Sequence, residues 1–182
     1  MEGSHFLATG ELIELSESNL VDCSWKNAGC RGGNQDLAFE YAEKYPLQLE
    51  SDYPYKTHLV NTCKYKKELG KVSVKTYSMV TPKKASQLKA ALNNGPVSVS
   101  IDAESDVFNN YSKGVITSLR CGTELDHAVL AVGYGTQDLI EYILVKNSWG
   151  PDWGENGYVK IGVGIGAGIC GVLTEPILPF TN

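Results

Sequence analysis

Five short runs of β-branched or alternating residues, all in the later part of the chain, constrain the fold more than any other feature of the sequence. Each run is bounded by Gly, Pro or Asn, as strands that end in turns commonly are. The runs are VSVKTYSMV, GPVSVSID, HAVLAVGYG, EYILVKNSW and GYVKIG. Residues 1–70 read instead as helices and loops. A helical part followed by a strand-rich part predicts an α+β protein with two segregated subdomains.

Three helices are expected from local signals. The first runs through residues 20–21, where Ser16 or Ser18 can cap its start. The second follows a Gly-rich turn and presents one apolar face, made of Leu37, Ala38, Tyr41 and Ala42. The third, KASQLKAALNN, interrupts the strand-rich part and ends at the Gly95–Pro96 pair, which is a strong stop signal.

Length and composition exclude several classes of protein. The 182 residues suffice for one large domain or two small ones. A net charge of −5 argues against nucleic acid and against a basic membrane-binding patch. The longest apolar run, HAVLAV, is far too short to span a bilayer. Residues 1–18 lack the basic start and apolar block of a secretory leader, so we expect such a segment to have been removed or to lie upstream.

The cysteines indicate disulfides rather than a metal site. The five are Cys23, Cys30, Cys63, Cys121 and Cys170. Because no C-x-x-C pair occurs, a zinc ribbon or a thioredoxin-like redox site is not expected, and we predict neither a metal nor a cofactor. Widely spaced cysteines are typical of an oxidising compartment, and the odd total leaves one thiol without a partner. The tripeptide Asn110–Ser112 matches a glycosylation site and points weakly to a secretory route.

Six blocks of the sequence resemble the papain-like cysteine peptidases, most closely the cathepsin L-type branch. The blocks are GELIELSESNLVDC, GCRGGNQDLAF, DYPY, GPVSVSIDA, LDHAVLAVGYG and KNSWGPDWGENGYVKI. They occur in the family's order and at about its spacing. The resemblance implies a helical subdomain over residues 1–78, an antiparallel, barrel-like subdomain over 79–175, and a tail over 176–182 that crosses back to the helical part. It also implies an active-site cleft between the subdomains.

The resemblance makes His127 the acid–base residue and Asn147 its orienting partner. A nearby imidazolium lowers the pKa of a cysteine thiol, and the resulting thiolate is the nucleophile. A side-chain amide can fix the other ring nitrogen without adding a charge. Trp149 is expected to shield this pair from water, with Trp153 packed beside it. Without the resemblance, a lone histidine before an apolar strand reads as structural, and His5 and His58, which lie in no such block, keep that interpretation.

The expected nucleophile is absent from the sequence. In papain and the cathepsins the nucleophile precedes the histidine and the asparagine by about 130 to 150 residues. Counted back from His127 and Asn147, this spacing places the nucleophile upstream of Met1. Cys23, the first cysteine, belongs to a structural disulfide in the family. We therefore expect the chain to begin just after the nucleophile, and to lack the upstream glutamine that supplies an oxyanion donor. The chain alone is expected to be inactive.

The resemblance also assigns the cysteines. It pairs Cys23 with Cys63 and Cys121 with Cys170. It leaves Cys30 unpaired, because its usual partner lies a few residues before the nucleophile. The alternative interpretation of Cys30 is an inert buried thiol.

Substrate-binding residues follow from the same resemblance. Gly32 and Gly33 would form an open wall that a substrate backbone can approach closely. Asn34 and Gln35 would make the second specificity pocket more polar than usual. The other lining positions are Ser100, Leu125, Ala128 and Trp149. Glu175 would close this pocket and allow it to accept arginine; its alternative interpretation is a solvated surface glutamate.

Three functional hypotheses remain open at this stage. The first is a papain-like endopeptidase whose nucleophile lies on a segment outside the chain. The second is a non-enzymatic relative that binds peptides or partners through the surviving cleft, and the third is a structural or storage protein. Expected partners are peptide or protein substrates, a propeptide or a protein inhibitor, and further copies of the chain that cover apolar surface near its start. The expected location is lysosomal, vacuolar or secreted.

Overall fold

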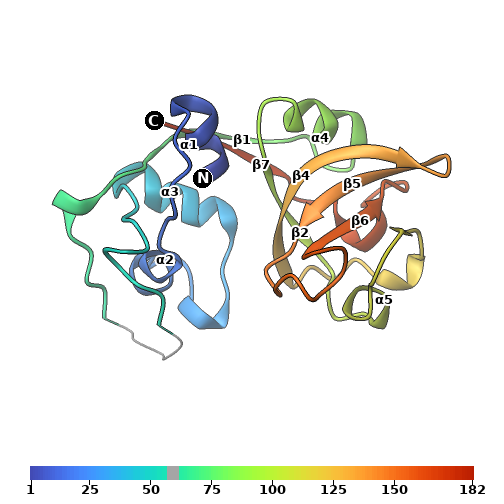
Figure 1. Ribbon diagram of the computed structural model, residues 1–182, viewed down its shortest axis with the longest axis horizontal. Helices are drawn as coiled ribbons and strands as arrows, with labels where there is room; N and C mark the ends of the chain where they lie inside the picture. Colours follow the sequence, from blue (N-terminus) through green and yellow to red (C-terminus); the bar gives the residue numbers. More distant parts are fainter. Residues whose placement is uncertain (57–61) are drawn as a thin grey trace. The chain divides into compact units, whose positions relative to one another are not determined.

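The computed structural model describes residues 1–56 and 62–182, which form two compact units (Figure 1). The first unit is Met1–Ser78 with Pro179–Asn182, and the second is Met79–Leu178. We expected the tail to begin at residue 176, three residues too early. Pro176 accepts a hydrogen bond from the Val80 amide, and Leu178 is buried in the core of the second unit. These contacts keep residues 176–178 with the sheet.

The first unit is built from short helices joined by loops. They are α1 (Glu2–Thr9), α2 (Glu17–Cys23), the 3-10 turn η1 (Gly29–Arg31), α3 (Gln35–Lys44) and the 3-10 turn η2 (Lys67–Leu69). The predicted cap of α2 is confirmed, because Ser16 Oγ accepts a hydrogen bond from the Asn19 amide at 3.0 Å. Among the described residues, no helix has the length and apolar composition needed to cross a bilayer.

The predicted buried face of α3 is partly wrong. Tyr41 and Ala42 are buried as expected, whereas Leu37 and Ala38 are only half-buried. Phe39 is buried instead, with its ring centroid 5.9 Å from that of Tyr77. The helix is therefore turned so that its large aromatic side chain takes the interior position.

The second unit is a largely antiparallel sheet with two short helices, so the α+β class is confirmed. The strands of the chain are β1 (Val74–Met79), β2 (Val97–Ile101), β3 (Val115–Ile116), β4 (His127–Gln137), β5 (Ile140–Lys146), β6 (Tyr158–Gly162) and β7 (Ile177–Thr181). The sheet order is β1-β7-β2-β4-β5-β6-β3, and the chain passes between its two units within β1 and β7. All five predicted strands form; β3 and β7 are additional.

The core of the second unit is built largely from buried side chains of β2, β4, β5 and β6. Helix α4 (Ala85–Leu92) places Leu88 in it, and α5 (Asp106–Asn109) places Phe108 in it, both with no exposed surface. The 3-10 turns η3 (Leu119–Cys121) and η4 (Ile169–Gly171) are joined there by a buried disulfide. A tightly packed core of this kind holds the ends of the strands in fixed positions.

Candidate active site

Two neighbouring strands bring His127 and Asn147 together. His127 is the first residue of β4, and Asn147 directly follows the last residue of β5. These strands are antiparallel with Leu130 opposite Lys146, so the start of β4 lies beside the end of β5. His127 Nε2 is 2.8 Å from Asn147 Oδ1. The structure thus joins the two residues that the sequence predicted as partners.

The hydrogen bonds around Asn147 determine which imidazole nitrogen is left available. Asn147 Oδ1 also accepts a hydrogen bond from the Ser148 amide at 2.8 Å. An atom that accepts from a backbone N–H is the amide oxygen, so it must also accept from His127 Nε2–H. In a neutral ring, Nδ1 then carries the free lone pair. Within the described part of the second unit, no residue forms a hydrogen bond with Nδ1, which leaves this nitrogen able to take a proton.

Asn147 is fixed by its backbone as well as by its side chain. Its amide donates to the Gly157 carbonyl at 2.9 Å, and only 7% of the residue is exposed. Its side-chain nitrogen Nδ2 is buried and has no hydrogen-bond partner in the described part of the chain. Leaving a buried donor unsatisfied costs about 1–3 kcal/mol. Folded proteins carry few such groups, and a functional site is one place where they persist.

An aromatic layer covers the imidazole. The Trp149 ring stacks on His127 with centroids 5.2 Å apart and planes 29° apart. Trp153 meets Trp149 edge-on at 5.3 Å, and Phe108 contacts both indoles. The Trp153 Nε1–H donates to the Asn109 carbonyl at 3.2 Å. Trp149 and Trp153 therefore lie where the sequence placed them, whereas Phe108 was not predicted.

Besides Trp149, four of the predicted substrate-binding residues lie in the second unit. Ser100 and Ala128 face each other across the β2–β4 pair. Ser100 Oγ donates to Glu175 Oε2 at 3.3 Å, so the structure brings these three residues together. Glu175 is exposed and Leu125 is half-buried. The surface exposure of Glu175 is compatible with both of its interpretations.

The other four predicted residues lie in the first unit, on the loop that leads into α3. Gly32 has φ +107°, and a Cβ at this position would meet no atom within 4 Å. At Gly33, a Cβ would lie 2.3 Å from Asn27 Oδ1, which accepts a hydrogen bond from the Asn34 amide. Gly33 is thus required by a structural contact, and only Gly32 is open. Asn34 precedes α3 and Gln35 is its first residue.

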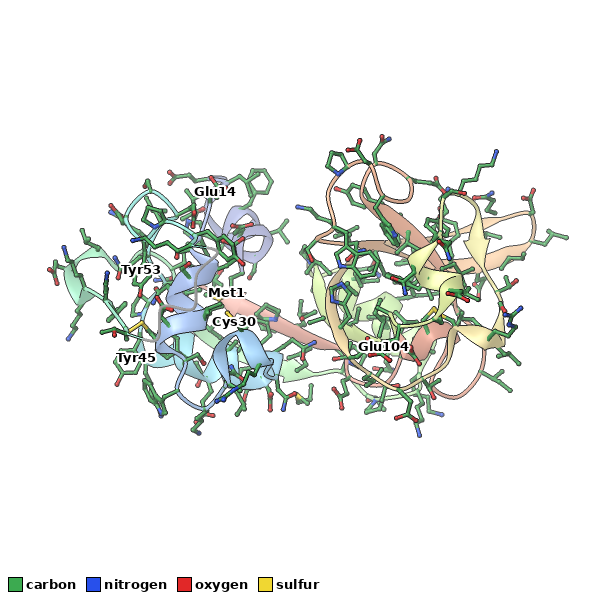
Figure 2. The ribbon with its side chains drawn as sticks, turned by 90° about the horizontal axis from the view of Figure 1, so that it is seen from below. Met1, Glu14, Cys30, Tyr45, Tyr53 and Glu104 are labelled. Atoms are coloured by element: carbon green, nitrogen blue, oxygen red, sulfur yellow. A yellow bond between two sulfur atoms is a disulfide. The ribbon has the colours of Figure 1, made fainter. Side chains whose placement is uncertain are left out.

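The cysteines form two disulfides. These are Cys23–Cys63, with an S–S distance of 2.13 Å, and Cys121–Cys170, with 2.02 Å. Cys30 is free and exposed in η1, and its position is marked in Figure 2. The alternative interpretation of Cys30 as a buried thiol is wrong, because η1 has no buried residue.

The remaining histidines lie outside this constellation. His5 Nδ1 is 2.9 Å from the Asn182 carbonyl oxygen, a contact within the first unit. His58 falls outside the described residues. No group of three or more His, Cys, Asp or Glu side chains suited to a metal ion occurs among residues 1–56 and 62–182.

Comparisons with known proteins agree with this site. The family described as papain family cysteine protease matches residues 1–180. Germination-specific cysteine protease 1 of Arabidopsis thaliana is 43% identical over 184 residues, covering 98% of this chain and 49% of that protein. Vignain of Ricinus communis is 44% identical over 186 residues, covering 99% and 51%. The chain belongs to the papain family of cysteine proteases.

Solved structures show the same fold. The Carica candamarcensis cysteine protease CMS1MS2, in complex with E-64, matches with a TM-score of 0.89 and 37% identity, covering 98% of this chain and 83% of that one. The proform of Amb a 11, a ragweed pollen cysteine protease, matches with a TM-score of 0.93 and 38% identity, covering 100% and 56%. The chain spans about half the length of the curated relatives named above.

Proposed function

We propose that the chain carries the acid–base part of a peptidase that hydrolyses peptide bonds by a Cys-His-Asn mechanism. The observation that carries this proposal is the His127 ring, which Asn147 holds at Nε2 and which has no hydrogen-bond partner at Nδ1 in the described part of the second unit. Both cysteines of the second unit are joined in a disulfide, and the free Cys30 belongs to the first unit. Because the resemblance makes Cys30 a disulfide partner and not the nucleophile, the nucleophilic thiol would come from a segment outside the 182 residues.

The geometry suits each proton transfer of such a reaction. His127 Nδ1 takes the proton of the thiol, and the thiolate sulfur attacks the scissile carbonyl carbon. When the C–N bond breaks, the imidazolium returns its proton to the leaving amine. Water then attacks the thioester with His127 as general base, releasing the acid and the thiol. Asn147 holds the ring in one orientation throughout, and Trp149 limits the access of water to one ring face.

Substrate binding is proposed on the predicted residues. Gly32 offers backbone that a peptide can approach without meeting a side chain. The hydrogen bond from Ser100 orients Glu175, whose exposed carboxylate would accept an arginine side chain of the substrate. Asn34 and Gln35 would make the second specificity pocket more polar. The proteins from Carica candamarcensis and ragweed, solved with E-64 and as a proform, support binding of a peptide-like inhibitor and of a propeptide. The two disulfides support a vacuolar, lysosomal or secreted location.

Supplying the nucleophile tests the proposed activity. The 182 residues alone are expected to leave a fluorogenic Phe-Arg dipeptide substrate uncut. The same chain joined to a preceding segment with a C-G-S-C-W block is expected to give thiol-dependent turnover. A segment with serine in place of the nucleophilic cysteine is the control and should be inactive.

Two results would contradict the proposal. Thiol-dependent turnover by the 182 residues alone would mean that the nucleophile is already present. No turnover by the joined and folded protein, together with retained peptide binding, would favour the non-enzymatic relative. Failure of the joined protein to cut an Arg-Arg substrate would reject only the role of Glu175.

We also propose that the chain associates with itself through α1. None of the residues in this helix is buried, and Phe6 and Leu7 are 47% and 61% exposed. Sedimentation in a Cys30→Ser background, which prevents intermolecular disulfides, is expected to show dimers or larger species. The double variant Phe6→Ser, Leu7→Ser should be monomeric. Leu139→Ser, which removes a 97% exposed leucine in the other unit, is the matched control, and a monomeric parent chain would reject the proposal.

A further inference from the structure

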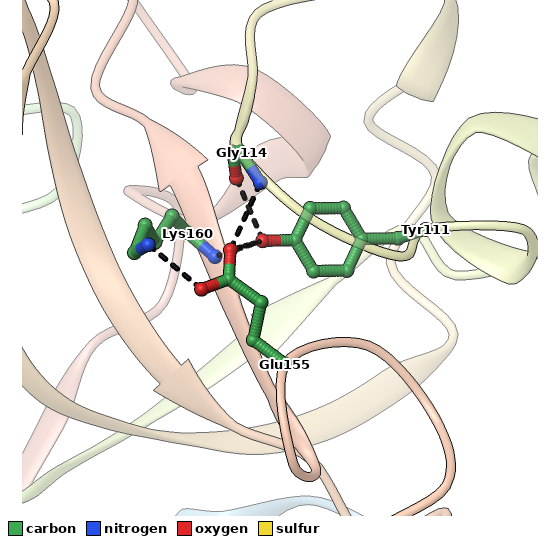
Figure 3. A network of polar contacts seen from close by, with 4 residues as sticks. All are labelled: Tyr111, Gly114, Glu155 and Lys160. Carbon is green, nitrogen blue, oxygen red and sulfur yellow. Dashed lines mark hydrogen bonds and ion pairs between the residues drawn. The ribbon is translucent and has the colours of Figure 1, made fainter.

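One carboxylate in the second unit joins the loop after α5 to strand β6 (Figure 3). Glu155 Oε1 accepts hydrogen bonds from the Tyr111 hydroxyl at 2.8 Å and from the Gly114 amide at 2.9 Å. Glu155 Oε2 accepts from Lys160 Nζ at 2.8 Å. Tyr111 and Gly114 belong to the loop after α5, and Lys160 belongs to β6. Because both oxygens are engaged, the side chain is held in one orientation.

The charges around this group favour the same arrangement. The hydrogen bond from Lys160, and next that from Tyr111, lower the pKa of Glu155 below its ordinary value. Burial, and next the bond to Glu155, raise the pKa of Tyr111. The Tyr111 hydroxyl also lies 2.6 Å from the Gly114 carbonyl oxygen, and its single proton can serve only one of the two acceptors at a time. The lowered pKa of Glu155 favours its carboxylate form, and the raised pKa of Tyr111 favours its neutral phenol.

The first route from Glu155 to the active site runs through aromatic rings. The Tyr111 ring lies 5.7 Å from Trp153, which meets Trp149 at 5.3 Å. Trp149 in turn stacks on His127 at 5.2 Å. Tyr111 is only 8% exposed, so its ring cannot move without disturbing Trp153. Holding the Tyr111 ring in place therefore holds Trp153, and Trp153 in turn holds Trp149 over the imidazole.

The second route runs through the backbone. The Glu155 amide donates to the Tyr158 carbonyl at 2.9 Å, and the Tyr158 amide donates back at 3.1 Å. Between these residues lies Gly157, whose carbonyl accepts the Asn147 amide at 2.9 Å. Asn147 Oδ1 then holds His127 Nε2. The turn anchored by Glu155 therefore also positions the amide that orients the imidazole.

We propose that Glu155 is a positioning residue for His127, acting through Trp149 on the face of the ring and through Asn147 on its edge. The inference rests on the proposed function, because it assigns Glu155 a part in keeping the acid–base residue oriented. The alternative is that the network stabilises the unit and does not affect the imidazole. The two alternatives differ in what a change at Glu155 does to Asn147 and Trp149 in the folded protein.

Three variants separate them. Glu155→Ala removes both carboxylate oxygens that accept hydrogen bonds in the network. Glu155→Gln keeps an amide oxygen that can accept from Gly114 and Tyr111, and loses the hydrogen bond and the ion pair with Lys160. Glu141→Ala is the matched control, because Glu141 forms an ion pair with Lys89 at 2.6 Å in the same unit, and within the described residues its side chain has no hydrogen bond or ion pair with the two routes.

Hydrogen exchange on the 182-residue chain is the first measurement and needs no activity. In Glu155→Ala, the Asn147 amide and the Trp153 indole N–H are expected to exchange about tenfold faster, while the amides of β2 keep their protection. Glu155→Gln should recover most of the protection, and Glu141→Ala should match the parent chain. Equal acceleration at β2, or no change at Asn147 and Trp153, would overturn the proposal.

Tryptophan fluorescence reports on the imidazole itself. In a Trp25→Phe background, the remaining indoles are Trp149 and Trp153. Trp149 stacks on His127 with centroids 5.2 Å apart, so its emission reports on that stack. Glu155→Ala is expected to shift the emission of the folded protein to longer wavelength, because the stack loosens and water reaches the indole. An emission spectrum identical to that of Glu141→Ala would reject the proposal.

Kinetics then connect the position of the ring to the reaction. In the chain joined to a nucleophile segment, Glu155→Ala is expected to lower kcat by about 10- to 100-fold with KM changed less than about twofold. Unchanged kcat, beside altered exchange and fluorescence, would overturn the link to catalysis. If the joined protein shows no activity at all, the proposed function fails, whereas exchange and fluorescence still decide whether Glu155 positions His127.

Discussion

Replacement of His127 by alanine is expected to lower kcat/KM of the chain joined to its nucleophile segment by about 10³- to 10⁴-fold. General acid–base catalysis contributes about 10² to 10⁴ to such rates. The substitution also leaves the thiol without the cation that keeps it ionised, which places the loss at the upper end of that range. The measurement is hydrolysis of a Phe-Arg substrate in the presence of a reducing thiol.

Two companion variants make this result interpretable. Asn147→Ala should lose less activity than His127→Ala, because Trp149 still stacks on the ring after the amide is removed. His5→Ala removes another histidine with a hydrogen-bond partner, far along the sequence from the active-site blocks, and should retain full activity. If His127→Ala kept more than about a tenth of the parent activity, His127 could not be the proton carrier.

The strands could be predicted from sequence because each carries its own signal. Alternating or β-branched runs between turn residues need no knowledge of their neighbours, and all five predicted runs became strands. β7 was missed because Pro179 interrupts its sequence, ILPFT, and a proline argues against a central strand. β3 has only two residues and α5 only four, too few for a periodic pattern. Phe39 was missed because the burial of a short helix is decided by its neighbours.

The active site could be predicted only in part, for a related reason. His127, Asn147 and Trp149 lie in blocks that resemble a known family, so their association followed from that resemblance. Phe108 and Tyr111 lie in none of these blocks, and although Glu155 lies in the last one, nothing in that block predicts its contact with Tyr111. Tyr111 and Glu155 are 44 residues apart, and their contact exists only once the sheet has formed.

The role of the two predicted substrate-binding glycines could not be decided from the sequence. Gly33 was interpreted as an open position, but a side chain there would collide with Asn27. Gly32 and Glu175 belong to different units. A pocket that combines them therefore remains a prediction.

Phe108→Ala is expected to lower the free energy of unfolding of the second unit by about 3–5 kcal/mol. Removing a fully buried phenylalanine leaves a cavity as well as a loss of apolar burial. Phe108 has no exposed surface, and its ring lies 5.4 Å from Trp149 and 4.9 Å from Trp153. Its loss should therefore also let both indoles move within the folded state. Urea unfolding followed by fluorescence in a Trp25→Phe background measures the second unit, because both remaining indoles belong to it.

Leu88→Ala separates loss of stability from disturbance of the site. Leu88 is as fully buried as Phe108 and belongs to the same core, so its replacement should cost about 2–5 kcal/mol. Leu88 belongs to α4, whereas Phe108 is the residue whose ring contacts both indoles, so the emission of folded Leu88→Ala should match that of the parent. Phe108→Ala should instead shift this emission before unfolding begins. A loss below about 1 kcal/mol, or an unshifted spectrum, would show that the aromatic layer over His127 does not depend on Phe108.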